Sequence, residues 1–218
     1  MELVTFKEIS IIFSIWVAVY GIDSWRREYV GKRKMELAEQ ILALFYQAKD
    51  IISYIRSPFS FVGEGSSRKK NEHETEEQTK LYNQAYIVFE RYESNKEVFN
   101  KIKSLRYQLM ALHGQDACQP FDDLNSIVHE IFGASRRLSR YWLQQGHINP
   151  VTEEFKRHLE QMYEAEAIFW EGSEEDPVIP KVEKAITDIE SICKPIIESK
   201  GTLFGILNLN LFMNRTGT

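Results

Sequence analysis

An apolar stretch from Ile9 to Ile22, ISIIFSIWVAVYGI, lies near the start of the sequence and runs into a strongly basic segment. The basic residues of this segment are Arg26, Arg27, Lys32, Arg33 and Lys34. An apolar helix with Lys and Arg on one flank is typical of a membrane anchor, and the basic flank stays in the cytoplasm. The chain is therefore expected to fold as an apolar anchor followed by a separate cytoplasmic body.

The length of the apolar segment decides between an anchor and its alternatives. About 20 apolar residues cross a bilayer, and runs of roughly 10 to 14 are more often buried or interfacial. The segment reaches that length when Val4 to Ile22 is counted, with Lys7 extending toward the lipid headgroups. A cleaved signal peptide has its basic residues before the apolar run, which is the reverse order. A buried core helix stays open, but three residues favour the anchor as interfacial aromatics: Trp16, Tyr20 and Trp25.

Small residues recur every four positions within the apolar segment, at Ser10, Ser14 and Ala18. Residues at this spacing share one face of a helix, and small side chains let membrane helices approach closely. The same residues also occur in such segments by chance. If the stripe is a contact face, the protein is a homo-oligomer held partly through its anchors.

The residues after Lys34 are predominantly acidic. Up to Lys34 there are six basic and four acidic residues, and the remainder contains 21 basic and 28 acidic residues. Such a body has no general attraction for nucleic acid, which we do not expect as a partner. Cys118 and Cys193 have no paired spacing and fit a reducing cytosol. We therefore expect a single-pass protein of the inner (cytoplasmic) membrane with its C-terminal body in the cytoplasm.

Apolar residues recur every three or four positions through the body, which is the period of amphipathic helices. The first helix should end at Arg56, because the residue before Pro58 is pushed out of the helical conformation. Further helices are expected over Glu74–His113 with a possible break at Ser94–Asn95, from Pro120 to Gly146, from Thr152 to Trp170, and from Pro180 with a kink or early end at Pro195. The predicted fold class is all-α: an N-terminal transmembrane helix that continues into a cytoplasmic four- or five-helix bundle.

The sequence thus divides into a membrane anchor (residues 1–25), a cytoplasmic helical bundle (residues 26–200) and an apolar C-terminal tail (residues 201–218). The tail contains LFGILNLNLFM from Leu203 to Met213, which is too short to span a bilayer. It can form an edge strand, touch the membrane or pack on the bundle. Packing against a neighbouring chain is the preferred interpretation.

The segment that follows Arg56, SPFSFVGEGSSRKKN, has an unusual composition for a linker. Flexible linkers are rich in Gly and Ser and seldom carry large apolar residues. One interpretation is an ordered loop whose phenylalanines dock on the bundle, and we favour it. The other is a binding site for a partner or ligand that uses backbone amides near the glycines. The candidate residues are Arg56, Phe59, Phe61, Gly63 and Gly65.

Arg and His pairs in the helices invite comparison with ribonucleases. Helical-bundle ribonucleases of the HEPN class carry an Arg and a His with four to six residues between them, where both meet the scissile phosphate. Arg106 and His113 resemble this pattern, and similar pairs occur at Arg140 with His147 and at Arg68 with His73. Five histidines produce such matches by chance, and the tyrosine after Arg106 departs from the usual motif. A catalytic role for Arg106 and His113 is the alternative hypothesis.

The strongest cationic and aromatic cluster contains Arg136, Arg137, Arg140 and Trp142. Arg pairs with phosphate and Trp offers a stacking face, so the cluster can bind a nucleotide or RNA. The plainer interpretation places the arginines in solvent and the aromatic residues in the core, and we prefer it. The spacing of His, Cys and acidic residues matches no metal site, and no motif indicates a cofactor or a catalytic nucleophile.

Two motifs, Trp25-Arg26-Arg27-Glu28 and Ile55-Arg56-Ser57-Pro58-Phe59, occur in the first 68 residues. This part of the chain resembles bacterial membrane-anchored proteins of uncharacterised function that have a cytoplasmic helical domain. The resemblance implies no activity. The sequence therefore favours a non-enzymatic, membrane-anchored helical protein that acts through protein contacts, either as a homo-oligomer or by recruiting a partner. The alternative is a membrane-linked effector, such as a HEPN-like ribonuclease or a ligand-gated pore-former.

Overall fold

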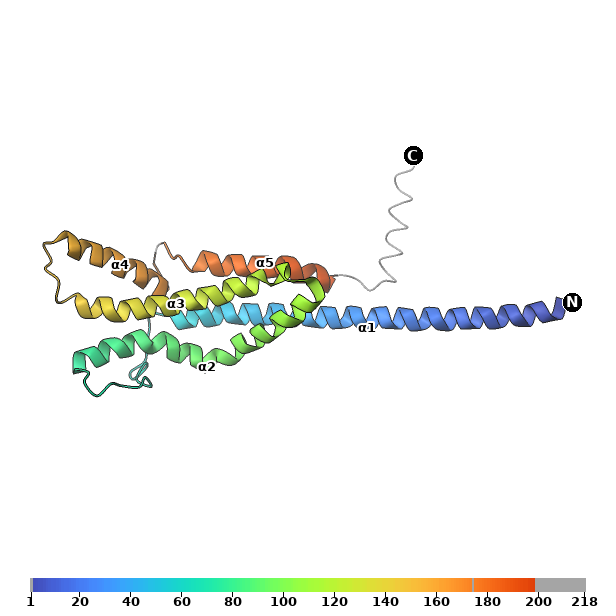
Figure 1. The fold of residues 1–218 in the computed structure, drawn as a ribbon, viewed down its shortest axis with the longest axis horizontal. Helices are drawn as coiled ribbons and strands as arrows, with labels where there is room; N and C mark the ends of the chain where they lie inside the picture. The colour runs from blue at the N-terminus through green and yellow to red at the C-terminus, as the bar shows by residue number, and fades with distance from the viewer. Residues whose placement is uncertain (1, 174, 199–218) are drawn as a thin grey trace, which may run out of the picture. The chain divides into compact units, whose positions relative to one another are not determined.

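The computed structural model describes residues 2–173 and 175–198, so the predicted C-terminal tail lies outside the described residues. The described part contains five α-helices and one short 3-10 helix, and no strand (Figure 1). They are α1 (Glu2–Arg56), α2 (Glu76–His113), η1 (Asp116–Cys118), α3 (Gln119–Gln144), α4 (Glu153–Phe169) and α5 (Ile179–Glu198). The prediction of an all-α fold is confirmed.

The chain divides into two compact units, one of which contains the first 40 residues and the chain from Cys193 onward. In this unit α1 continues through Gly31 without interruption, as expected for one continuous helix. From Glu8 onward, α1 is long and apolar enough to cross a membrane by length and composition alone; its most apolar stretch has a mean hydropathy of 1.3 and none of it is buried. A core helix would be mostly buried, so among the described residues this segment behaves as an exposed apolar helix.

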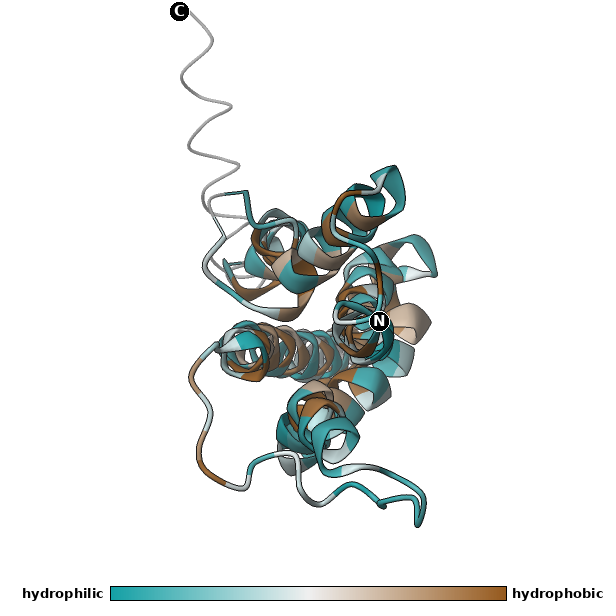
Figure 2. Cartoon of the chain, turned by 90° about the vertical axis from the view of Figure 1, so that its left-hand side faces the viewer, coloured by the Kyte–Doolittle hydropathy of each residue, from teal (hydrophilic) through white to brown (hydrophobic). Residues whose placement is uncertain are grey.

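The second unit, Ile41–Ile192, is the helical bundle. Its helices bury apolar residues at the predicted spacing; α3, for example, buries Leu124, Ile127, Ile131 and Leu138. In the view along the helices, each helix carries both hydrophobic and hydrophilic residues (Figure 2). Helix α3 contacts all the others, through the pairs Phe45–Phe121, Ser135–Ala85, Trp142–Phe169 and Glu130–Lys181. It is therefore the central helix of the bundle.

Several helix ends lie where local sequence signals place them. Helix α1 ends at Arg56, before Ser57–Pro58. Thr152 caps the N-terminus of α4, and its hydroxyl accepts a hydrogen bond from the Phe155 amide at 3.2 Å. Helix α2 starts with a reciprocal cap, in which Thr75 and Gln78 each bond the other's backbone amide. These side chains satisfy amide groups that have no partner inside the helix.

The predicted break in α2 and the predicted early end of α5 are absent. Helix α2 continues through Ser94 and Asn95, whose side chains donate to carbonyls four residues earlier, at Glu90 (3.0 Å) and Arg91 (2.8 Å). Such bonds bend helices without ending them, and α2 is visibly bent (Figure 1). Helix α5 likewise continues through Pro195 to Glu198, so the proline does not end it.

Candidate functional site

The loop between α1 and α2 is held by Arg91, a residue of α2 that is 2% exposed. Its Nε and Nη2 donate to the two carboxylate oxygens of Glu64 at 2.6 and 2.9 Å. Nη1 reaches the carbonyls of Tyr54 (3.0 Å) and Ser57 (2.8 Å), and Nη2 reaches that of Phe59 (2.6 Å). The hydrogen bond from Arg91 lowers the pKa of Glu64, although burial opposes the shift. One buried guanidinium thus joins the end of α1, the loop and α2.

Other side chains fix the rest of the loop. The Glu90 carboxylate accepts hydrogen bonds from the Gly65 amide (3.0 Å) and the Ser67 hydroxyl (2.6 Å). Arg68 binds both oxygens of Glu74, at 2.8 and 2.5 Å, and this hydrogen-bonded pairing lowers the pKa of Glu74 to about 2. The loop is therefore an ordered element of the fold and not a linker.

The two glycines predicted to expose backbone amides are needed for the turn itself. Gly63 and Gly65 have φ values of +87° and +84°, which other residues adopt only with strain. A Cβ on Gly65 would lie 2.0 Å from the carbonyl oxygen of Asn83. The Gly65 amide is already donated to Glu90, and the Gly63 carbonyl accepts from the Ser66 amide at 3.2 Å. Their contacts support a structural role.

The apolar side chains of the loop lie in solvent. Phe59 is 85% exposed and Phe61 is 81% exposed, and Val62 is fully exposed. The expectation that the phenylalanines dock on the bundle is therefore wrong. Arg91 holds this segment through its backbone carbonyls and through Glu64, so no apolar contact is required to order it. We call these three residues, Phe59, Phe61 and Val62, the apolar tip.

Arg56, another predicted binding residue, is 1% exposed and links three helix ends. It donates to the carbonyls of Ile168 (2.8 Å), Ala167 (2.9 Å) and Trp170 (3.0 Å), which belong to the end of α4. Cations are favourable at helix C-termini, where the unpaired carbonyls gather. Its Nη2 also donates to the Asp176 carboxylate at 2.8 Å. The Arg56 side chain therefore serves the packing of the bundle.

Asp176 completes this junction at the start of α5. Its second oxygen accepts hydrogen bonds from the amides of Val178 (2.8 Å) and Ile179 (3.1 Å). Burial would raise the pKa of Asp176, but the bonds from Arg56 and from these two amides outweigh burial and lower it. The junction therefore favours the charged form of the Asp176 carboxylate.

The predicted cationic and aromatic cluster separates into two environments. Arg136, Arg137 and Arg140 are exposed, and they form no ion pair with the described residues. The Arg136 guanidinium lies 5.8 Å from the ring centre of Phe89. Trp142 is partly buried, donates to a Glu166 carboxylate oxygen at 2.8 Å and meets Phe169 edge to face. The arginines thus lie in solvent while the indole packs between α3 and α4.

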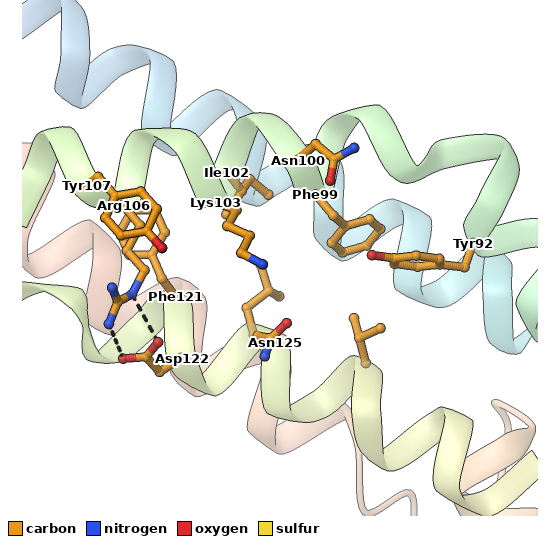
Figure 3. Close-up of a pocket in the computed structure, with 12 residues that line it drawn as sticks. Tyr92, Phe99, Asn100, Ile102, Lys103, Arg106, Tyr107, Phe121, Asp122 and Asn125 are labelled. Atoms are coloured by element: carbon orange, nitrogen blue, oxygen red, sulfur yellow. Dashed lines mark hydrogen bonds and ion pairs between the residues drawn. The ribbon is translucent and has the colours of Figure 1, made fainter.

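A pocket of about 330 Å³ lies between α2 and α3 (Figure 3). At one end Arg106 donates through Nε and Nη2 to the two oxygens of Asp122, at 3.0 and 2.9 Å. At the other end the rings of Tyr92 and Phe99 lie 4.9 Å apart. Burial raises the pKa of Tyr92. Lys103 extends from α2 toward α3 between the two ends.

The structure places the predicted Arg106 and His113 pair on α2 in different settings. Arg106 lines the pocket and is held by Asp122, whose hydrogen bonds raise its pKa. His113 is the exposed last residue of the helix and does not line that pocket. The described residues contain no group of three or more His, Cys, Asp or Glu side chains arranged to hold a metal ion.

Arg91 and Glu64, the pair that orders the loop, are not among the residues predicted from the sequence. A signal was present for the arginine, because Arg91 follows Ile87 and Val88 at the spacing of buried positions. A charged residue on an apolar helix face indicates a buried ion pair or hydrogen-bonded cap. Its partner lies 27 residues earlier and cannot be identified from the periodicity.

Comparison with known proteins gives no family assignment: no protein family, no curated protein and no solved structure matches the chain.

Proposed function

We propose that this protein is a membrane-anchored helical adaptor that recruits another protein through the apolar tip. The observation that supports the proposal is that Phe59, Phe61 and Val62 are exposed on a loop whose backbone is fixed by buried Arg91. Because the backbone that carries these side chains is fixed, the segment loses less conformational entropy on binding, and aromatic residues carry much of the energy at protein interfaces.

The charge of the loop favours a protein over a lipid surface as the partner. Residues 57–75 contain three basic residues, Arg68, Lys69 and Lys70, and three acidic residues, Glu64, Glu72 and Glu74. Binding to anionic lipid is driven by clusters of basic residues, which attract the headgroups. A loop with no net charge gains little from that attraction, whereas its aromatic side chains suit an apolar pocket on a protein.

The anchoring part of the proposal rests on the N-terminal half of α1. Its large apolar residues are exposed, including Ile12 at 67%, Phe13 at 62% and Trp16 at 61%. The basic flank that follows the apolar segment favours an anchor in the inner membrane with the helical body in the cytoplasm. Ser10, Ser14 and Ala18 offer a face for self-association, and the Ser14 hydroxyl donates within the helix to the Ser10 carbonyl at 2.8 Å. A crosslinking scan with single cysteines should then show a four-residue phase.

Site-specific photocrosslinking in cells tests the recruitment. Benzoylphenylalanine would replace Phe61, and in a matched control it would replace Val151, an isolated apolar residue that is 90% exposed. We expect one discrete protein adduct at position 61, lost in the F59S background and absent at position 151. The purified adduct partner should then bind wild-type protein and not F61S.

Three outcomes would contradict the proposal. Adducts at position 61 that contain only lipid would assign the tip to a membrane surface. Adducts with a second copy of the chain would favour a homo-oligomer. Identical adduct patterns at positions 61 and 151 would show that the tip has no selective partner.

A further inference from the structure

The pocket between α2 and α3 is separate from the apolar tip and has the composition of a small-molecule site. Its volume of about 330 Å³ lies at the lower end of the range for ligand pockets, roughly 300 to 1,000 Å³. Such sites combine apolar walls with a few polar groups that orient the ligand. The small volume restricts the ligand to about the size of a mononucleotide.

One end of the pocket suits a planar ring. Tyr92 and Phe99 line it with rings 4.9 Å apart and inclined by 31°. Phe132 meets Tyr92 edge to face at 5.0 Å, which fixes the position of the tyrosine ring. Aromatic faces bind bases by stacking, a contribution of about 1–3 kcal/mol per base.

The rest of the pocket, from its middle to the end opposite the rings, carries a net positive charge. The charged residues of the lining are Lys103, Arg106 and Asp122. The Arg106 and Asp122 charges compensate each other, and the Nη1 group of Arg106 takes no part in their bond. Lys103 forms no ion pair with any described residue. An unpaired ammonium beside a guanidinium with spare donors favours an anion such as a phosphate.

Two amides complete the lining between these ends. Asn125 of α3 lies beside Lys103 in Figure 3, and Asn100 belongs to the same lining on α2. Each amide offers both donors and acceptors, which is the requirement for reading the edge of a base or a ribose hydroxyl.

We infer that this pocket binds a nucleoside monophosphate or a similarly small phosphorylated aromatic molecule. The ring stacks at Tyr92 and Phe99, the phosphate meets Lys103 and the free Arg106 donors, and the amides bind the polar atoms between them. The acidic body of the chain and the small volume favour a mononucleotide over a nucleic-acid strand.

Equilibrium dialysis of the full-length protein in detergent micelles, with radiolabelled adenosine, guanosine, cytidine and uridine monophosphates, tests the site. We expect saturable binding of at least one of them, and weaker binding of the matching nucleoside. K103A should weaken nucleotide binding about fivefold to tenfold and leave nucleoside binding unchanged, because it removes only the phosphate contact. K101A changes an exposed lysine of the same helix that does not line the pocket, and it should bind like wild type.

A second variant guards against indirect effects. N125L introduces an apolar side chain at an exposed lining position, so it should weaken nucleotide and nucleoside binding together without loss of thermal stability. No saturable binding of any of the four nucleotides up to about 1 mM would overturn the inference, as would binding that neither K103A nor N125L changes. Tighter, Lys103-dependent binding of a ten-nucleotide single-stranded RNA would also contradict it, because the ligand would then be a strand.

Discussion

Two regions of this protein expose apolar side chains, and they do so in different ways. In the N-terminal half of α1 the exposure extends over several turns, with Ile12, Phe13 and Trp16 all more than 60% exposed. In the apolar tip it is confined to three residues on a loop whose backbone is held by Arg91. A long continuous apolar surface suits a lipid environment, whereas a small fixed patch suits a pocket on another protein.

The two regions also differ in the hydrogen bonds that hold their backbone. The apolar segment of α1 has the backbone hydrogen bonds of a continuous helix, which is what a bilayer requires of a spanning segment. The tip relies on long-range bonds from the bundle, through the Arg91–Glu64 pair and the Glu90 carboxylate. The comparison teaches that an exposed apolar residue is informative only together with the contacts that hold its backbone.

The largest expected effect comes from charging the apolar helix. F13K combined with V17K should abolish membrane integration, because a lysine near the centre of a spanning helix costs about 2.5–3.5 kcal/mol. Carbonate extraction of membranes measures the loss. V62K, which charges the tip, should leave integration intact and abolish the adduct at position 61. If the F13K/V17K variant stayed in the membrane, the assignment of the apolar segment of α1 to the bilayer would be contradicted.

The next largest effect is expected from the support of the tip. R91M should lower the free energy of unfolding by about 3–5 kcal/mol, because it leaves partly buried Glu64 and several carbonyls without their partner. Urea unfolding followed by circular dichroism measures this change, and limited proteolysis should detect new cleavage within residues 57–75. The control R137M changes an exposed arginine and should stay within about 0.5 kcal/mol of wild type. Equal effects of the two variants would contradict the role of Arg91.

Acid should weaken the ion pairs of the loop and of the Arg56 junction by a smaller amount. The folded protein holds the pKa of Glu74 at about 2, against 4.5 for an unperturbed glutamate, and it also lowers those of Glu64 and Asp176. The unfolded chain therefore binds these protons more tightly, so this stability is complete above pH 4.5 and is lost as the pH falls toward 2. Thermal melts across this range should show a falling Tm. E74Q should reduce the acid sensitivity, and E154Q, at an exposed position, should not.

The smallest expected effect concerns the tip itself. F61A should change the free energy of unfolding by no more than about 0.5 kcal/mol, because its ring contacts solvent. F45A removes a fully buried phenylalanine that meets Phe121, and it should cost about 3–5 kcal/mol. Chemical denaturation of both variants gives the comparison. A large loss of unfolding free energy in F61A would mean that the apolar tip is part of the core.

Local signals made the helices predictable. Three signals act through the neighbouring backbone: Ser57–Pro58 after Arg56, Thr152 before an apolar repeat, and Pro120 at the start of α3. The structure confirms the helix end or start that each one predicts. Ser94 and Asn95 misled because a local hydrogen bond within the helix replaced the expected break. A single sequence does not tell whether such a residue caps a new helix or bonds a carbonyl of the existing one.

Long-range contacts made the candidate sites unpredictable. Phe59 and Phe61 were expected to dock because large apolar residues usually bury themselves. Whether they do so depends on Arg91, which reaches the loop from another helix and occupies its carbonyls. The α2–α3 pocket likewise depends on which residues face each other, such as Arg106 and Asp122, and periodicity gives only the face of each helix.

Spin-label accessibility in the full-length protein, reconstituted into lipid nanodiscs, distinguishes the surroundings of the two apolar regions. Single cysteines at positions 13, 17 and 61 would carry the label. Cys118 and Cys193 are buried, and burial raises the pKa of both thiols, that of Cys193 to about 11. Their labelling is therefore suppressed. We predict that labels at 13 and 17 are accessible to oxygen and shielded from a water-soluble nickel complex. The label at 61 should be open to the nickel complex. A lipid-like response at 61, or a water-like response at 13 and 17, would contradict the assignment of one apolar region to the bilayer and the other to a protein partner.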